Sequence, residues 1–307
     1  MPFVKKTFHI PTPTKAFLFV MRNFNLTQAE SQRFIDKGRI VVDNKPLYDK
    51  KATISGDIEV IYFEPQSRGI KPIFSTRDFL IYDKPSGVLT HPNCMATEYS
   101  MLDEIRLHSG SSANATHRID METSGLLLAS RHKKAERFIK SSFEKKTIQK
   151  YYLAWVKGKI TEPFIVEEPI KIRDDYSTNK HKVEINQDGK YAKTEFKPIT
   201  YDSSLDASLI ECKPLTGRTH QIRVHLFHVK HSILGDPIYG TSFEYATKYL
   251  DGVITEDERL KATGATRLML HANSLDFEYR CRYYIVSKVN FYKFKKEICS
   301  PKERLFF

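Results

Sequence analysis

The chain has 307 residues and a formal net charge of +12, from 49 Lys and Arg against 37 Asp and Glu. This length accommodates one large domain with a small one, or two medium domains. The positive charge favours a polyanionic partner such as nucleic acid, although a merely lysine-rich protein would have a similar composition.

Several classes of protein are not indicated by the sequence. The four cysteines are widely spaced and form no C-x-x-C pair, which argues against both a zinc site and a disulfide framework. The histidines between His220 and His231 match no tight ligand spacing, and there is no P-loop or dinucleotide-binding glycine motif. No segment approaches the roughly 20 apolar residues of a membrane span, and the N-terminus lacks the apolar core of a signal peptide. We therefore expect a cytoplasmic protein that uses neither a metal nor another cofactor and does not enter a membrane.

The N-terminal part, residues 14–63, predicts two short helices and a small strand region. Apolar side chains at 17, 18 and 21 fall at helical spacing, and Thr27 followed by Glu30 has the spacing of a capping box. Gly38 is expected to end the second helix. Strand-prone runs follow at 39–46 and 54–60.

Basic side chains gather on this N-terminal region. Arg33 and Lys37 are four residues apart, so they share one side of the second predicted helix, and Arg39 begins the following strand. Such a group would contact phosphates and give affinity without sequence choice. A solvated basic face is the alternative interpretation.

A polar, proline-bounded stretch over residues 64–72 indicates a linker. We predict an N-terminal domain at 1–63, a linker at 64–74 and a second domain at 75–307. Within the second domain a helix is expected at 133–143, and the short β-prone runs are 79–82, 147–156, 190–196, 209–212 and 268–270. Many strands with few helices predict an α+β fold on a mixed or antiparallel sheet.

One segment stands out as a candidate for chemistry. Residues 117–125 read HRIDMETSG and lead directly into the apolar run LLLA. A charged turn that feeds a buried strand is unusual for a solvated loop, and the carboxylate of Asp120 lies near the guanidinium of Arg118 in the sequence. This combination can hold an ionised nucleophile against a polyanion. Asp120 is therefore the candidate catalytic residue.

The segment resembles the active-site signature of the RluA-type RNA pseudouridine synthases. Further segments resemble other motifs of that family and occur in the same order: 83–92, 150–158, 214–226, 235–240 and 270–272. The resemblance implies a pseudouridine synthase catalytic domain. The N-terminal region is similar to the small alpha-L RNA-binding domain, of the S-four ribosomal type, that precedes the catalytic domain in many of these enzymes.

The resemblance also implies roles for individual residues. Asp120 would act as the ionised catalyst, and Arg218 would be the nearby cation that keeps the pKa of this carboxyl group low. An ordinary surface arginine is the alternative for Arg218. Tyr152 would lie on a strand of the cleft, where its ring can stack on uracil and its hydroxyl can act in proton transfer. Tyr151 would take this role if the strand register were shifted by one residue.

A uridine within a helix must flip out of the stack before it can react. Arg118 is placed to enter the resulting gap or to hold the displaced phosphate, with a structural salt bridge as the alternative. His117 is a second candidate for contact with RNA, and a hydrogen bond to the protein backbone is its other possible role.

The chain departs from the family pattern beside Asp120 and again further along the sequence. Met121 and Glu122 stand where other residues are usual, and residues 241–266 form a longer connection than many relatives have. This connection is expected to be a surface insertion. It contains an acidic run at 256–258.

The resulting hypothesis is a monomeric RNA pseudouridine synthase that acts without a cofactor, with large-subunit ribosomal RNA as the expected partner. A tRNA pseudouridine synthase is one alternative. The other is a non-catalytic RNA-binding or ribosome assembly factor. The joint presence of Asp120, Tyr152 and Arg218 argues against this last alternative, because loss of activity would be expected to erase at least one of them.

Overall fold

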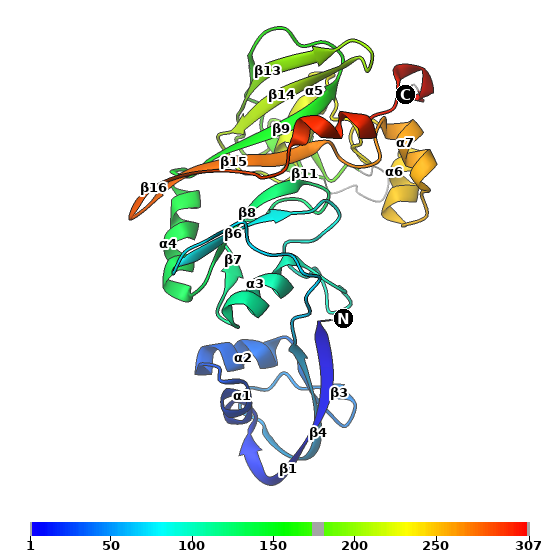
Figure 1. The fold of residues 1–307 in the computed structure, drawn as a ribbon. Helices are drawn as coiled ribbons and strands as arrows, with labels where there is room; N and C mark the ends of the chain where they lie inside the picture. Colours follow the sequence, from blue (N-terminus) through cyan, green and yellow to red (C-terminus); the bar gives the residue numbers. More distant parts are fainter. Residues whose placement is uncertain (1, 174–180, 306–307) are drawn as a thin grey trace.

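The computed structural model describes residues 2–173 and 181–305. A small N-terminal unit, blue in Figure 1, lies beside a larger unit built on an extended sheet. The C-terminus lies at the far end of the larger unit from the N-terminal one (Figure 1). The fold is of the predicted α+β class.

The N-terminal unit is a four-stranded sheet covered by two helices, with strand order β1-β4-β2-β3. Its elements are β1 (Phe3–Lys15), α1 (Ala16–Phe24), α2 (Gln28–Asp36), β2 (Ile40–Val42), β3 (Lys45–Pro46) and β4 (Thr53–Phe63). Both predicted helices are confirmed, and the capping box of Thr27 with Glu30 begins α2. Phe19 and Val20 of α1 and Ile35 of α2 pack on the sheet to form a separate hydrophobic core.

The long strand β1 was not predicted. It pairs antiparallel with β4 from Phe3 opposite Phe63 to Lys15 opposite Thr53, with a register shift between Ile10 and Thr14. Pro11 and Pro13 fall within that shift. The strand tolerates them because β1 is an edge strand and the irregular register removes ladder hydrogen bonds that proline could not make.

The larger unit contains a sheet of ten strands among the described residues. The main path runs β10-β13-β14-β9-β15-β8-β6-β5, with β16 paired to β15 and β7 paired to β8. The β15–β8 pair is parallel and the other pairs are antiparallel. The strands are β5 (Phe74–Ser75), β6 (Phe79–Lys84), β7 (Asn114–Ala115), β8 (Ser124–Ser130), β9 (Gln149–Lys157), β10 (Phe164–Val166), β13 (Thr194–Asp202), β14 (Ala207–Pro214), β15 (Leu270–Tyr279) and β16 (Cys281–Val286).

Helices pack on both faces of the part of this sheet formed by β6 and β8. In Figure 1, α4 (Lys133–Glu144) is on one side, α6 (Phe243–Leu250) and α7 (Glu256–Thr263) are on the opposite side, and α3 (Met101–Ser109) faces the N-terminal unit. The remaining elements are α5 (Gln221–His228), the hairpin of β11 (Ile170–Ile172) and β12 (Val183–Ile185), and the 3-10 helices η1 (Phe291–Glu297) and η2 (Pro301–Glu303).

Most of the predicted elements of the second domain are present. The helix expected at 133–143 is α4, and the runs at 79–82, 147–156 and 209–212 lie in or overlap β6, β9 and β14. The run at 190–196 was too long, because β13 begins only at Thr194. Before that point, Lys190 exchanges backbone hydrogen bonds with Ile170, and the carbonyl oxygen of Lys193 accepts the backbone nitrogen of Leu215.

The segment between the two units is attached to α3. The backbone nitrogen of Gln66 donates to Asp103 at 3.1 Å, and that of Arg68 donates to Glu104 at 2.6 Å. These two carboxylates at the start of α3 satisfy backbone donors that a polar linker would otherwise leave to water. The domain boundaries at 63 and 75 stay predictions.

Candidate active site

A cleft of about 1700 Å³ opens over the middle of the large sheet. Its volume exceeds the roughly 300–1000 Å³ of pockets that hold small ligands, so the cleft suits a larger molecule. Eight of its described lining residues are Lys or Arg and four are Asp or Glu. A cleft with this excess of positive charge attracts polyanions and concentrates them.

Asp120 lies in this cleft, on the loop between β7 and β8. Its side chain is 31% exposed, so the carboxylate is supported by the protein and still open to a substrate. Nη1 of Arg223 contacts Oδ2 of Asp120 at 3.3 Å. The guanidinium thus places a positive charge directly beside the carboxylate.

Arg223 belongs to α5, and its side chain is only 3% exposed. Its Nε and Nη2 donate to the two carboxylate oxygens of Asp236 at 2.7 and 2.8 Å. Burial alone would lower the pKa of Arg223, but Asp236 and Asp120 together hold it above its usual value. A bidentate pair of this kind fixes the guanidinium plane. The third nitrogen is thereby aimed at Asp120.

The structure brings Arg223 to Asp120 and does not bring Arg218, the expected partner, to it. Arg218 is exposed at the rim of the cleft, and its Nε donates to the carbonyl oxygen of Tyr191 at 3.0 Å. It precedes α5, whereas Arg223 lies inside that helix and faces the core. The arginine that contacts Asp120 lies in the same motif segment, five residues further along the chain.

Sequence reasoning missed Arg223 and Asp236, although a signal for both was present. Arg223 stands between Ile222 and Val224, and a guanidinium in an apolar helix requires a buried carboxylate. Asp236 lies in the G-D-P segment that follows. Its Oδ1 also accepts the backbone nitrogens of Ile238 and Tyr239, which satisfies the remaining lone pairs of the buried group.

His220 also faces Asp120, at 3.8 Å from Nε2 to Oδ2. Burial and the nearby Arg223 lower the pKa of His220 to about 4, so the ring is neutral at pH 7. The hydroxyl of Tyr239 accepts the backbone nitrogen of Val183 and contacts Nδ1 of His220 at 3.0 Å. The hydroxyl can then donate its proton to Nδ1, which leaves the ring proton on Nε2, directed toward Asp120.

Tyr152 is on β9 and lines the cleft, whereas Tyr151 is not among the described lining residues. It lies opposite Cys212 of β14 and Ala272 of β15 in the sheet ladder. Burial and the charge of Asp120 raise the pKa of its hydroxyl, so the group is a neutral phenol at pH 7. The structure thus brings Tyr152 and Asp120 into one cleft.

Arg118 and His117 occupy adjacent positions but have different surroundings. Arg118 is exposed, lines the cleft, and has no hydrogen bond or ion pair with the residues that the structure describes. His117 is half-buried, and its Nε2 accepts the backbone nitrogen of Leu128 at 3.0 Å. Burial and the charge of Lys150 lower the pKa of His117 to about 3. A neutral ring that is bonded to β8 is poorly suited to attract phosphate.

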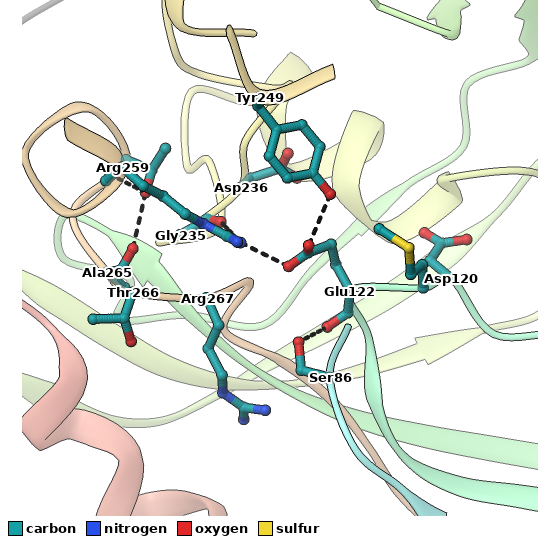
Figure 2. A network of polar contacts seen from close by, with 12 residues as sticks. Ser86, Asp120, Glu122, Gly235, Asp236, Tyr249, Arg259, Ala265, Thr266 and Arg267 are labelled. Carbon is teal, nitrogen blue, oxygen red and sulfur yellow. Dashed lines mark hydrogen bonds and ion pairs between the residues drawn. The ribbon is translucent and has the colours of Figure 1, made fainter. Parts of the chain in front are cut away.

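The loop that carries Asp120 rests on residues 84–87. The buried Lys84 donates through Nζ to the carbonyl oxygens of Pro85, Val88 and Met121 at 2.9, 2.7 and 2.9 Å. Ser86 donates to the carbonyl oxygen of Glu122 at 2.6 Å (Figure 2). The backbone on the C-terminal side of Asp120 is therefore held by direct hydrogen bonds.

The predicted basic group of the N-terminal unit is present as a surface feature. Arg33 and Lys37 are exposed at the end of α2, and the half-buried Arg39 lies over the rings of Phe3 and Phe34. Burial and the charges of Arg39, Arg106 and Arg33 lower the pKa of Lys37. Arg106 comes from α3, so cations of both units approach one another here.

No helix within residues 2–173 and 181–305 has both the length and the apolar character needed to cross a membrane. The same described ranges contain no cluster of three or more His, Cys, Asp or Glu side chains that could hold a metal ion.

Comparison with known proteins identifies the family. Residues 78–228 match the RNA pseudouridylate synthase family. An uncharacterized RNA pseudouridine synthase of Helicobacter pylori J99 is 37% identical over 288 residues, which cover 94% of this chain and 96% of that protein. The chain therefore belongs to the RNA pseudouridine synthase family, and it is an isomerase that acts on RNA.

Two other relatives differ in the RNA that their names specify. The mitochondrial tRNA pseudouridine(32) synthase of Saccharomyces cerevisiae is 30% identical over 79% of this chain and 55% of that protein. A ribosomal large subunit pseudouridine synthase D of Zymomonas mobilis is 34% identical over 58% of each chain. Among solved structures, human RNA pseudouridylate synthase domain containing 1 has a TM-score of 0.59 at 23% identity, covering 74% of this chain and 86% of that one. This last likeness concerns the fold.

Proposed function

We propose that the chain converts specific uridines of large-subunit ribosomal RNA to pseudouridine, with Asp120 as the catalytic residue. One observation carries the proposal most directly. Asp120 is a partly exposed carboxylate in a basic cleft, and it is held by a buried arginine whose other face is paired with Asp236. This arrangement places a carboxylate beside a fixed positive charge in a cleft that attracts a polyanion, which suits a carboxylate that acts on RNA.

The reaction breaks the bond between N1 of uracil and C1′ of ribose and forms a bond between C5 and C1′. C5 loses its proton and N1 gains one, so the isomerisation is redox-neutral and requires no cofactor. A single ionised carboxylate can assist it, either by attack on the sugar or the base or by assisting elimination at the ribose. Each of these routes requires Asp120 in its charged form.

The other cleft residues have complementary roles in this proposal. Tyr152 stacks on the flipped uracil, and its neutral hydroxyl is available for proton transfer. Arg118 enters the gap left by the base or holds the displaced phosphate, which its exposure and its lack of a described partner support. Arg218 at the rim, oriented by Tyr191, binds a phosphate of the RNA instead of pairing with Asp120.

We assign the N-terminal unit to RNA binding, as an alpha-L domain, through Arg33, Lys37 and Arg39. Arg106 continues this positive group onto α3, and the charges of Arg118, Lys140 and Arg106 contribute, after burial, to the lowered pKa of His91 in the cleft. Cations thus occur from α2 to the rim of the cleft. A bound RNA would span both units along this path.

The choice of ribosomal RNA follows the two-unit organisation, which is typical of family members that modify the large subunit. The relative from Zymomonas mobilis, named for this substrate, supports it. Transfer RNA is the second candidate, because the yeast relative is named for tRNA and covers more of this chain.

The test is release of tritium from C5-labelled uridine in transcribed ribosomal RNA and tRNA. We compare the wild type with Asp120→Asn, and with Asp188→Asn as a control at an exposed aspartate. Release from ribosomal RNA alone, lost only in Asp120→Asn, is the expected result. Release from tRNA alone would replace the substrate. Tight binding to RNA without release from any RNA would favour an assembly factor.

A further inference from the structure

The connection at residues 241–266, expected as a surface insertion, is attached to the loop of Asp120. We refer to α6 and α7, residues 243–263, as the α6–α7 unit. Tyr249 of α6 donates its hydroxyl to Oε1 of Glu122 at 2.7 Å, and Nη2 of Arg259 on α7 contacts Oε2 at 2.6 Å. Figure 2 shows both contacts converging on Glu122, close to Asp120.

Glu122 is buried, and both of its carboxylate oxygens are used by the α6–α7 unit. Burial alone would raise its pKa, but the ion pair with Arg259 and the hydrogen bonds from Arg259 and Tyr249 hold the pKa below its usual value. A buried ion pair in this geometry is costly to break on one side only. The position of Glu122, two residues after Asp120, is therefore tied to the position of Arg259.

Arg259 also reaches the opposite side of the site. The same Nη2 donates to the carbonyl oxygen of Gly235 at 3.3 Å. Gly235 directly precedes Asp236, which holds Arg223 against Asp120. Arg259 thus links the chain segment of the catalytic carboxylate with the segment that fixes its cationic partner.

These contacts form a closed ring. It runs from Asp120 to Arg223 and Asp236, along the backbone to Gly235, across to Arg259, and through Glu122 and Met121 back to Asp120. Two segments far apart in sequence, 120–122 and 235–236, are thereby held at a set separation. The rate of an enzyme falls when its catalytic groups are misplaced by about 1 Å, so a ring that fixes their separation would support the reaction rate.

The α6–α7 unit is itself stiffened. Lys248 of α6 contacts Glu258 of α7 at 3.0 Å, and Thr255 and Glu258 form a capping box at the start of α7. Tyr249 and Leu250 of α6 also line the cleft. The unit is therefore both a wall of the cleft and the support of Arg259.

We propose that Arg259 is a positioning residue, which acts through Glu122 and Gly235 to set the distance between Asp120 and Arg223. The proposal rests on the proposed function of Asp120. It assigns to the α6–α7 unit a direct part in the reaction rate.

The experiment measures single-turnover pseudouridine formation and RNA affinity for Arg259→Met, Arg259→Lys, Glu122→Gln and the double variant Glu122→Gln/Arg259→Met. We expect Arg259→Met to lower the rate at least tenfold while RNA affinity changes less than twofold. Arg259→Lys should restore part of the rate, because lysine keeps the charge. The double variant should be no slower than the slower single variant, because both changes break one ring.

Lys261→Met is the matched control, since Lys261 lies on the same helix, is exposed, and pairs only with Asp257 among the described side chains. Its rate should equal that of the wild type. An Arg259→Met rate within twofold of the wild type would overturn the proposal. Rate losses that multiply in the double variant would do the same, since they would show two independent effects.

Hydrogen exchange provides a readout that does not depend on turnover. Amides of residues 119–123 should exchange faster in Arg259→Met than in the wild type or Lys261→Met, and unchanged exchange would contradict the proposal. If Arg259→Met does not fold, Tyr249→Phe and Arg259→Lys replace it. If the wild type modifies no RNA, the proposed function fails, while the exchange measurement still decides the positioning role.

Discussion

The buried guanidinium of Arg223 supports the partly exposed carboxylate of Asp120. Its three nitrogen atoms face two carboxylates, one fully buried on Asp236 and one open to the cleft on Asp120. The Asp236 pair offsets the desolvation of the guanidinium. Asp120 is therefore next to the positive charge without being buried around it, and remains accessible to a substrate.

A comparison of the two arginines tests this assignment. Arg223→Met would leave the carboxylate of Asp236 buried without its cation, and we expect the free energy of unfolding to fall by about 3–5 kcal/mol. Arg218→Met removes an exposed side chain, and a change within about 0.5 kcal/mol is expected. Urea denaturation measures both. Similar losses in the two variants would contradict the assignment of Arg223 as the structural partner.

The pH dependence of stability should report His117. Its pKa is about 3 in the folded chain and near 6.5 in an unfolded chain, so between these values the unfolded state binds more protons. The contribution of His117 to the free energy of unfolding is fully present above pH 6.5. It is lost as the pH falls toward 3, by up to about 1.4 kcal/mol per pH unit. Unfolding measured between pH 7.5 and 4.5 checks this.

His117→Gln is the informative variant for that profile, because glutamine can still accept the backbone nitrogen of Leu128. We expect a shallower loss of stability below pH 6.5 than in the wild type. His108→Gln, at an exposed position, is the control. A wild-type slope in His117→Gln would mean that the folded ring accepts a proton after all.

For individual residues, the sequence predicted which side chains line the cleft better than it predicted which of them contact one another. Asp120 and Tyr152 could be placed there because each belongs to a loop or strand whose position follows from its motif. The partner of Asp120 could not, because it depends on where α5 begins. The start of that helix at Gln221 leaves Arg218 outside and turns Arg223 inward.

Among the elements, the parallel contact between β8 and β15 sets a strict demand on one glycine. Gly125 has φ +105° and lies opposite Ala272, and a Cβ there would come within 2.6 Å of the Ala272 backbone nitrogen and closer still to its carbonyl oxygen. Because neighbouring backbone cannot move aside easily, only glycine fits.

We therefore expect Gly125→Ala to lose about 2 kcal/mol or more of unfolding free energy, from backbone strain and overpacking. Activity should also fall, because Asp120 is five residues away on the same loop and strand. Gly56→Ala is the control, since Gly56 also has positive φ (+73°) but nothing within 4 Å of the added Cβ. Thermal unfolding measures both variants. Equal losses of unfolding free energy would mean that the positive φ alone, and not the contact with Ala272, causes the effect.

Two elements show why part of the fold was hard to predict. β1 is a strand despite Pro11 and Pro13, because its pairing with β4 overrides local preference. The connection at 241–266 was expected to be a surface insertion, yet it binds Glu122, one of the two residues beside Asp120 that depart from the family pattern. Local composition contains no information about such distant contacts.

At the scale of the whole molecule, binding of RNA should depend on both units. Arg33→Ala/Lys37→Ala should weaken RNA affinity at every salt concentration and reduce the slope of log affinity against log salt by about 1.4, if each contacts one phosphate of single-stranded RNA. Pseudouridine formation at saturating RNA should be unchanged, because both residues are remote from Asp120.

Filter binding between 50 and 300 mM salt measures this slope. Lys261→Ala/Lys302→Ala removes the same charge from exposed positions on the side of α7 and η2, and should leave the slope nearly unchanged. Equal effects of the two double variants would mean that net charge alone matters, without a defined path from α2 to the cleft.

The long strand β1 has a consequence for handling the protein. A free edge of 13 residues is a surface on which a second chain can add a strand, and so a starting point for aggregation. Pro11 and Pro13 lack amide hydrogens, and the register with β4 shifts between Ile10 and Thr14, so this part of the edge is poorly suited to pairing with another strand. We therefore expect the two prolines to protect the folded chain from insoluble self-association, which would remove it from its RNA.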